Sequence, residues 1–75
     1  MKSQKIIVTG GSGFIGTNVV DYLLNNEYEV LNLDINPPKN FTHQKVWEKV
    51  DILDFKLLTE TLKNFNPQYI LHLAA

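Results

Sequence analysis

A strand that runs straight into a cluster of glycines constrains this chain more than any other feature. Residues 6–16 read Ile-Ile-Val-Thr-Gly-Gly-Ser-Gly-Phe-Ile-Gly. The β-branched residues at its start predict a strand that is buried on both faces. The residues that follow the glycines predict a helix, so unpaired backbone N–H groups and the positive end of a helix dipole meet at the turn. Such a turn suits an anion, above all a phosphate.

The rest of the chain alternates strands with amphipathic helices. The sequence predicts strands at Lys5–Thr9, Glu29–Asp34, Gln44–Val50 and Gln68–Ala75, and helices at Phe14–Asn25 and from an N-cap at Asp54 to Phe65. The apolar faces of the two helices are predicted to hold Ile15, Val19, Val20, Leu23 and Leu24, and Phe55, Leu58, Leu62 and Phe65.

Three details of these elements are also predicted. The pair at 25–26 is expected to end the first helix, because Asn tolerates the left-handed conformation. The prolines at 37–38 are expected to leave no room for a helix before the third strand. The fourth strand, with the sequence Gln-Tyr-Ile-Leu-His-Leu-Ala-Ala, is expected to be fully buried.

The resulting order, β-α-β-β-α-β, predicts an α/β fold. Alternating strands and helices favour a parallel sheet that is covered on two faces, with right-handed crossovers. The sequence therefore predicts the first half of a Rossmann-type doubly wound parallel sheet with strand order 3-2-1-4.

Composition excludes several classes of function. The net charge is -1 with no Arg in the chain, which argues against a nucleic-acid partner. The absence of Cys excludes disulfides and thiolate metal sites, and His43 has no second His nearby, so no metal site is predicted. With no signal-peptide pattern and no apolar run near the ~20 residues that span a bilayer, we expect no membrane contact and a cytoplasmic location.

The glycines fit two versions of a dinucleotide-binding motif. Residues 11–16 satisfy G-x-G-x-x-G, and Gly10, Gly13 and Gly16 satisfy G-x-x-G-x-x-G. A strand before the motif and a helix after it supply the context that the motif requires. The alternative is a simple turn in which Gly16 only allows close packing, but that leaves three glycines before the helix unexplained.

Asp34 ends the second strand, 34 − 16 = 18 residues after the last glycine. An acidic residue at about 20 residues accepts hydrogen bonds from the adenosine ribose and repels the 2′-phosphate of NADP. Asp34 and the absence of Arg therefore favour NAD over NADP, with Lys39 as an alternative contact for a 2′-phosphate. The competing interpretation is an ordinary exposed Asp that starts a turn.

The pair Asp51-Ile52 follows the third strand, at the edge where ligand contacts gather in such sheets. It is predicted to hold adenine, with a solvated approach to the second helix as the alternative. His72 is more typical of a hydrogen-bonded core residue than of a base or ligand, and Trp47 and Tyr69 are more typical of packing residues than of a stacking platform.

Together, Thr9-Gly10-Gly11-Ser12-Gly13-Phe14-Ile15-Gly16, Asp34, Asp51-Ile52 and His72-Leu73-Ala74-Ala75 resemble the extended short-chain dehydrogenase/reductase family, which includes NAD-dependent nucleotide-sugar epimerases and dehydratases. The resemblance implies the following cofactor contacts: Gly10, Gly13, Phe14 and Ile15 along the pyrophosphate, Asp34 and Asn36 at the ribose, Asp51 and Ile52 at the adenine, and Leu73, Ala74 and Ala75 beside the cofactor. Ile35 stands where the family often has Asn.

The same resemblance implies a catalytic Tyr-x-x-x-Lys pair, which this sequence lacks. Four positions after Tyr22, Tyr28 and Tyr69 stand Asn26, Asn32 and Leu73. We therefore predict no catalytic residue, and residues 1–75 as the N-terminal, cofactor-binding part of a longer epimerase or dehydratase. The alternatives are a non-catalytic dinucleotide-sensing module and a structural fragment with no affinity for the cofactor.

The fourth strand carries a further prediction. Residues 69–73 are apolar on both faces and contain no Lys or Pro that would protect an edge strand. We expect this edge to mediate self-association.

Overall fold

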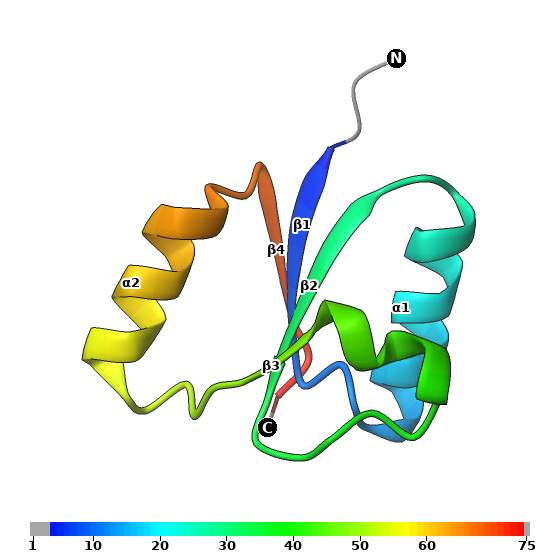
Figure 1. The fold of residues 1–75 in the computed structure, drawn as a ribbon, viewed down its shortest axis with the longest axis horizontal. Helices are drawn as coiled ribbons and strands as arrows, with labels where there is room; N and C mark the ends of the chain where they lie inside the picture. Colours follow the sequence, from blue (N-terminus) through cyan, green and yellow to red (C-terminus); the bar gives the residue numbers. More distant parts are fainter. Residues whose placement is uncertain (1–3, 75) are drawn as a thin grey trace.

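A computed structural model describes residues 4–74 as a parallel four-stranded sheet between two helical layers (Figure 1). The elements are β1 (Lys5–Thr9), α1 (Phe14–Asn25), β2 (Glu29–Asp34), the 3₁₀ helix η1 (Phe41–Val46), β3 (Trp47–Lys49), α2 (Phe55–Phe65) and β4 (Tyr69–His72). The strand order is β3-β2-β1-β4, with α1 and η1 on one face and α2 on the other. The predicted fold class and strand order are confirmed.

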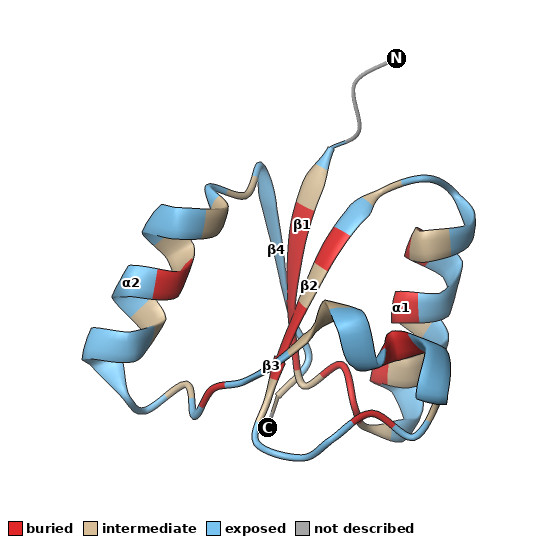
Figure 2. Cartoon of the chain, in the orientation of Figure 1, coloured by how far each residue is buried: buried red, intermediate tan, exposed pale blue. Residues whose placement is uncertain are grey.

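Each face of the sheet has its own apolar core, as the red segments of Figure 2 illustrate. Alternation along β1 sends Ile6 and Val8 toward α1 and Ile7 toward α2. On the α1 side these residues pack with Val20, Leu23 and Val30, and on the α2 side with Leu33, Val50, Leu58, Leu62 and Phe65. Burial of one such side chain contributes about 1.5–3 kcal/mol, so the strands that carry the glycine turn are firmly held.

The third strand is shorter than predicted, and the expectation of no helix before it is wrong. Residues 44–46 belong to η1 rather than to β3. The Asn40 side chain caps η1, because its Oδ1 accepts hydrogen bonds from the backbone N–H and the hydroxyl of Thr42, at 3.0 and 2.7 Å. His43, which also belongs to η1, is buried despite its polar sequence neighbours.

The fourth strand is not buried as predicted. β4 is limited to four residues, and Tyr69 and Ile70 are 55% and 52% exposed. Within residues 4–74, β4 pairs only with β1, so one of its edges is open. Ile15 and Phe55, predicted on the apolar helix faces, are exposed as well, since both lie in the first turn of their helices and beyond the edge of the core.

The helix ends confirm one prediction and correct another. Asp54 caps α2, with its Oδ1 accepting a hydrogen bond from the Leu57 N–H at 3.2 Å. Asn26 ends α1 with φ of −107°, and the left-handed residue is Glu27, with φ of 66°. In residues 4–74 neither α-helix has the length and apolarity needed to cross a membrane.

Candidate functional site

The carboxyl ends of β1, β2 and β3 and the segment after β4 meet at one edge of the sheet, at the bottom of Figure 1. Three adjoining hollows at this edge share Gly10 as a lining residue and together form one groove. Every predicted cofactor contact within residues 4–74 lines at least one of them: Gly10, Gly13, Phe14, Ile15, Gly16, Asp34, Asn36, Asp51, Ile52, Leu73 and Ala74. Ala75 lies outside the described residues.

The glycines of the turn differ in what the protein itself requires of them. Gly10 has φ of 77°, and a Cβ there would lie 2.7 Å from the backbone nitrogen of Ala74. At Gly16 a Cβ would collide with the carbonyl oxygen of Gly10. At Gly13, where φ is −75°, a Cβ would meet only the same oxygen, at an ordinary 3.6 Å. Within residues 4–74 no close contact requires a glycine at 13, and a side chain there would extend into open space where Gly13 lines two of the hollows.

The start of α1 offers free donors to the same hollow. Gly13 is the N-cap and provides no side-chain hydrogen bond. The first helical hydrogen bond runs from the Thr17 N–H to the Gly13 carbonyl at 2.8 Å. In residues 4–74 no group accepts from the N–H groups of Phe14, Ile15 or Gly16. Three donors at a helix N-terminus therefore face a glycine that leaves room for an anion.

Asp34 lies beside this turn and is bound to it. Its Oδ2 accepts a hydrogen bond from the Ser12 N–H at 3.0 Å, and its Oδ1 accepts one from the Asn36 N–H at 2.9 Å. The ammonium group of Lys39 donates to the Ser12 carbonyl at 3.1 Å. Asp34 therefore shapes the turn that follows it, as the competing interpretation of this residue predicted. Each of its carboxylate oxygens can still accept a further hydrogen bond, and Asp34 lines the groove.

Asn32 is a residue of the site that sequence reasoning missed. It is fully buried, and its Oδ1 accepts a hydrogen bond from the Gly11 N–H at 2.8 Å. Its Nδ2 donates to the Ser12 hydroxyl at 3.1 Å. The available signal was a single amide in a strand that otherwise carries apolar residues at its inner positions.

Asp51 and Ile52 line the hollow at the ends of β2 and β3. The Oδ1 of Asp51 accepts a hydrogen bond from the Leu53 N–H at 2.9 Å, and its carbonyl accepts one from the Asp54 N–H at 2.8 Å. Asp51 therefore also shapes the approach to α2, and its contact with adenine stays a prediction.

Neither histidine lines the hollows at the glycine turn. His72 is hydrogen-bonded as expected, with its Nδ1 2.7 Å from the Thr9 hydroxyl, but it is exposed, so the expectation of a core position is wrong. The Nε2 of buried His43 lies 3.4 Å from an Asp21 carboxylate oxygen. Among residues 4–74, no group of three or more His, Asp or Glu side chains gathers in a way that would hold a metal ion.

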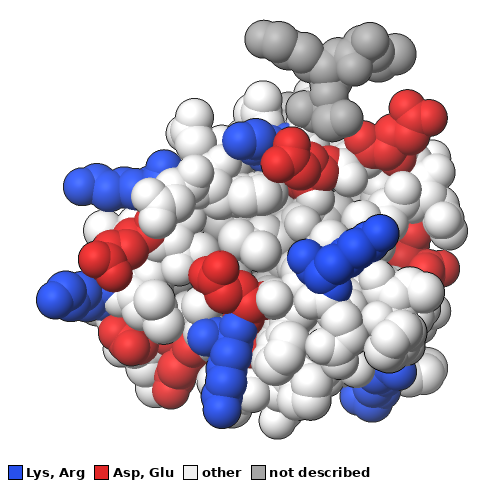
Figure 3. Space-filling model, in the orientation of Figure 1, with Lys and Arg blue, Asp and Glu red and all other residues white. Residues whose placement is uncertain are grey.

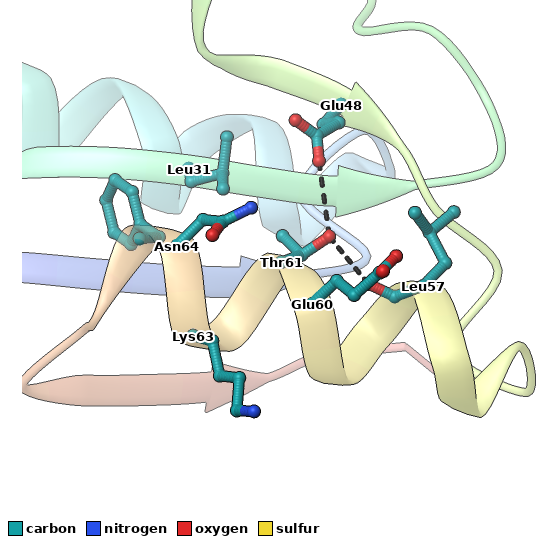
Figure 4. Close-up of a pocket in the computed structure, with 8 residues that line it drawn as sticks. Leu31, Glu48, Leu57, Glu60, Thr61, Lys63 and Asn64 are labelled. Carbon is teal, nitrogen blue, oxygen red and sulfur yellow. Dashed lines mark hydrogen bonds between the residues drawn. The ribbon is translucent and has the colours of Figure 1, made fainter.

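A separate hollow lies between α2 and the sheet (Figure 4). In it, the Thr61 hydroxyl donates to the Leu57 carbonyl at 2.8 Å, and its oxygen lies 3.3 Å from a carboxylate oxygen of Glu48. Leu31, Glu60, Lys63, Asn64 and Phe65 complete its lining. None of the predicted cofactor contacts lines this hollow.

On the face drawn in Figure 3, Lys and acidic side chains are interspersed rather than segregated.

Residues 6–75 match the family model described as the NAD dependent epimerase/dehydratase family. The chain belongs to this family. The suspected relationship to extended short-chain dehydrogenase/reductase enzymes is thereby confirmed.

Relatives in the family include a probable dTDP-glucose 4,6-dehydratase of Sinorhizobium fredii. It is 36% identical over an alignment of 82 positions, which covers 96% of this chain and 23% of that protein. A putative UDP-glucose 4-epimerase of Methanocaldococcus jannaschii is 38% identical over 79 residues, covering 93% and 24%. The chain thus spans about a quarter of the length of the curated relatives it matches.

Solved structures agree with this assignment. The dTDP-glucose 4,6-dehydratase of Bacillus anthracis, in complex with NAD, superposes with a TM-score of 0.86 at 32% identity, covering 97% of this chain and 27% of the other. The UDP-glucose 4-epimerase of Thermotoga maritima, with UDP-glucose, gives a TM-score of 0.84 at 33% identity, covering 96% and 24%. Similarity therefore extends over nearly the whole chain, including the glycine turn.

Proposed function

We propose that this chain is the NAD(H)-binding part of an epimerase or dehydratase that acts on nucleotide sugars. The observation that carries the proposal is Gly13, whose missing side chain opens the hollow to the free N–H groups of α1. A pyrophosphate suits such donors. The names of the relatives, which act on dTDP-glucose or UDP-glucose, support the substrate class.

In this proposal each part of the groove holds one part of the cofactor. The N–H groups of residues 14–16 bind the pyrophosphate beside Gly10 and Gly13. Asp34 and Asn36 bind the adenosine ribose, and Asp51 and Ile52 bind the adenine. Leu73 and Ala74, followed by Ala75, pass beside the cofactor toward its nicotinamide. When bound, NAD accepts and returns a hydride; without a Tyr-x-x-x-Lys pair the chain by itself is inactive.

We further propose that NAD binds more tightly than NADP. The carboxylate of Asp34 stands at the end of β2 and repels a 2′-phosphate. Lys39 donates to the carbonyl of Ser12, the residue whose N–H Asp34 binds, and its positive charge would reduce this repulsion.

Calorimetric titration with NAD, NADP and AMP tests both statements. We expect NAD and AMP to bind more tightly than NADP, by about tenfold for one unfavourable charge contact. Asp34→Asn, which removes the charge at nearly constant size, is expected to bring NADP close to NAD. Glu60→Gln on α2 removes an exposed charge away from the groove and serves as the control.

Two results would contradict the proposal in different ways. Equal affinity for NAD and NADP, unchanged in Asp34→Asn, would refute the role of Asp34. A chain that folds but binds none of the three ligands would refute cofactor binding and favour a purely structural role.

Three other sequence predictions belong to this proposal. Residues 1–75 form the N-terminal part of a dinucleotide-binding domain, the protein acts in the cytoplasm, and the open edge of β4 mediates self-association. The exposed apolar residues of β4 support the last of these.

A further inference from the structure

We propose that Asn32 is a positioning residue that holds the glycine turn in its ligand-binding conformation. This inference rests on the proposed function, since it concerns the same pyrophosphate site. Asn32 itself would not touch the ligand. It acts through the Gly11 and Ser12 backbone, which precedes the free donors of α1.

The burial of Asn32 indicates that its amide has a purpose. It occupies a central position of β2, pairs in register with Val8 of β1, and has no exposed surface. Burying a side-chain amide is unfavourable unless its polar atoms are hydrogen-bonded, and an apolar residue would fill this position without that cost. The oxygen and the nitrogen of this amide both bond to the turn.

Gly11 and Asn32 are fitted to one another. A Cβ at Gly11 would collide with the Oδ1 of Asn32, so only a glycine lets the amide reach the backbone N–H at 2.8 Å. That N–H points into the protein and is not offered to a ligand. The glycine at 11 therefore serves the contact with Asn32, whereas the glycine at 13 opens the hollow.

The two hydrogen bonds fix the peptides that lead into α1. A loop that becomes ordered only when its ligand binds loses conformational entropy at that step, which lowers the affinity. A loop that is ordered in advance avoids this loss. The effect concerns ligands that use the loop donors. A ligand that carries a pyrophosphate should depend on Asn32, and adenosine alone should not.

The test compares ADP with adenosine by calorimetry on the wild-type chain and on Asn32→Leu, in which an apolar side chain of similar shape replaces the amide. We expect the affinity for ADP to fall about tenfold or more, on the order of one ordered loop residue, and that for adenosine to change less than twofold. Asn64→Leu makes the same substitution at an exposed position of α2 and should change neither affinity.

A second measurement avoids any loss of folding in the variant. In the ligand-free wild-type chain, amide exchange followed by NMR should show a protected Gly11 N–H, and Ser12→Ala should leave that protection in place, because it removes only the bond from Nδ2.

The outcomes separate this inference from the proposed function. An equal loss of ADP and adenosine affinity in Asn32→Leu, no loss of either, or a rapidly exchanging Gly11 N–H would overturn the role of Asn32 while NAD binding stands. A folded wild-type chain that binds neither ADP nor adenosine would overturn the proposed function and this inference with it.

Discussion

At the residue scale, the four glycines divide into those that the turn needs for its own geometry and one that it does not. Gly10 and Gly16 are required by close backbone contacts, and Gly11 by the amide of Asn32. Gly13 has neither a positive φ nor a crowded Cβ. The motif as a whole therefore combines internal packing with space that is left for a ligand.

Substitution of Gly13 by Ala should separate stability from binding. We expect the free energy of unfolding to change by less than about 1 kcal/mol, since the added methyl group meets only an ordinary contact and N-cap preferences are of this size. ADP affinity should fall about tenfold or more, as the methyl group enters the hollow. Urea denaturation and calorimetry measure the two quantities.

Gly16→Ala is the matched comparison, because its methyl group would collide with the Gly10 carbonyl oxygen. It should lower the free energy of unfolding by about 1–3 kcal/mol, the usual result of overpacking. If Gly13→Ala were as destabilising as Gly16→Ala, the glycine at 13 would be structural.

The residues of the groove differ in whether the sequence predicts them. Spacing alone predicted Asp34 at the groove, because the glycines and the end of β2 are joined by one βαβ unit. Asn32 could not be predicted in the same way. Its contact with Gly11 depends on the register that sets it beside Val8 and on which face of β2 it occupies.

At the scale of elements, the bounds of β1, α1, β2 and α2 agree with the sequence predictions, because each has a clear period or cap. The errors fall where tertiary contacts override local pattern. Alternation at 44–50 resembled a strand throughout, yet burial of His43 and the Asn40 cap turn its first residues into η1. The apolar sequence of β4 indicated burial, which depends on neighbours that a local pattern does not describe.

The end of α1 provides a stability prediction. Glu27 adopts φ of 66°, which costs a residue with a Cβ about 1 kcal/mol relative to glycine. Glu27→Gly is therefore expected to raise the free energy of unfolding by about 0.5–1 kcal/mol, measured by urea denaturation. Glu29→Gly, in the adjacent strand β2, should lower it; the same sign for both variants would contradict this assignment of strain.

At the scale of the whole molecule, helices cover the two faces of the sheet except at β4, whose outer edge is also open in residues 4–74. Tyr69, Ile70 and Leu71 are 55%, 52% and 39% exposed. An unprotected strand edge is a template for pairing with another chain.

Sedimentation velocity tests whether this edge joins copies of the chain. We expect a concentration-dependent dimer or larger species at about tens of micromolar, where weak interfaces become populated. Ile70→Lys, which places a charge on the edge, should shift the chain toward monomer. Lys45→Ile in η1, which lies beside β2 rather than β4, adds an exposed apolar residue away from the edge and controls for general solubility. A wild-type chain that sediments only as a monomer would contradict the prediction.

The position of Trp47 has a practical consequence. It is the one tryptophan of the sequence, and its indole N–H donates to the backbone carbonyl of Asp34 at 2.9 Å. The fluorescent indole is therefore hydrogen-bonded to the residue that we assign to the adenosine ribose. Excitation of this indole should give an emission that shifts or is quenched as ADP or NAD enters the groove. The chain carries its own optical reporter of occupancy, without a label and without catalysis.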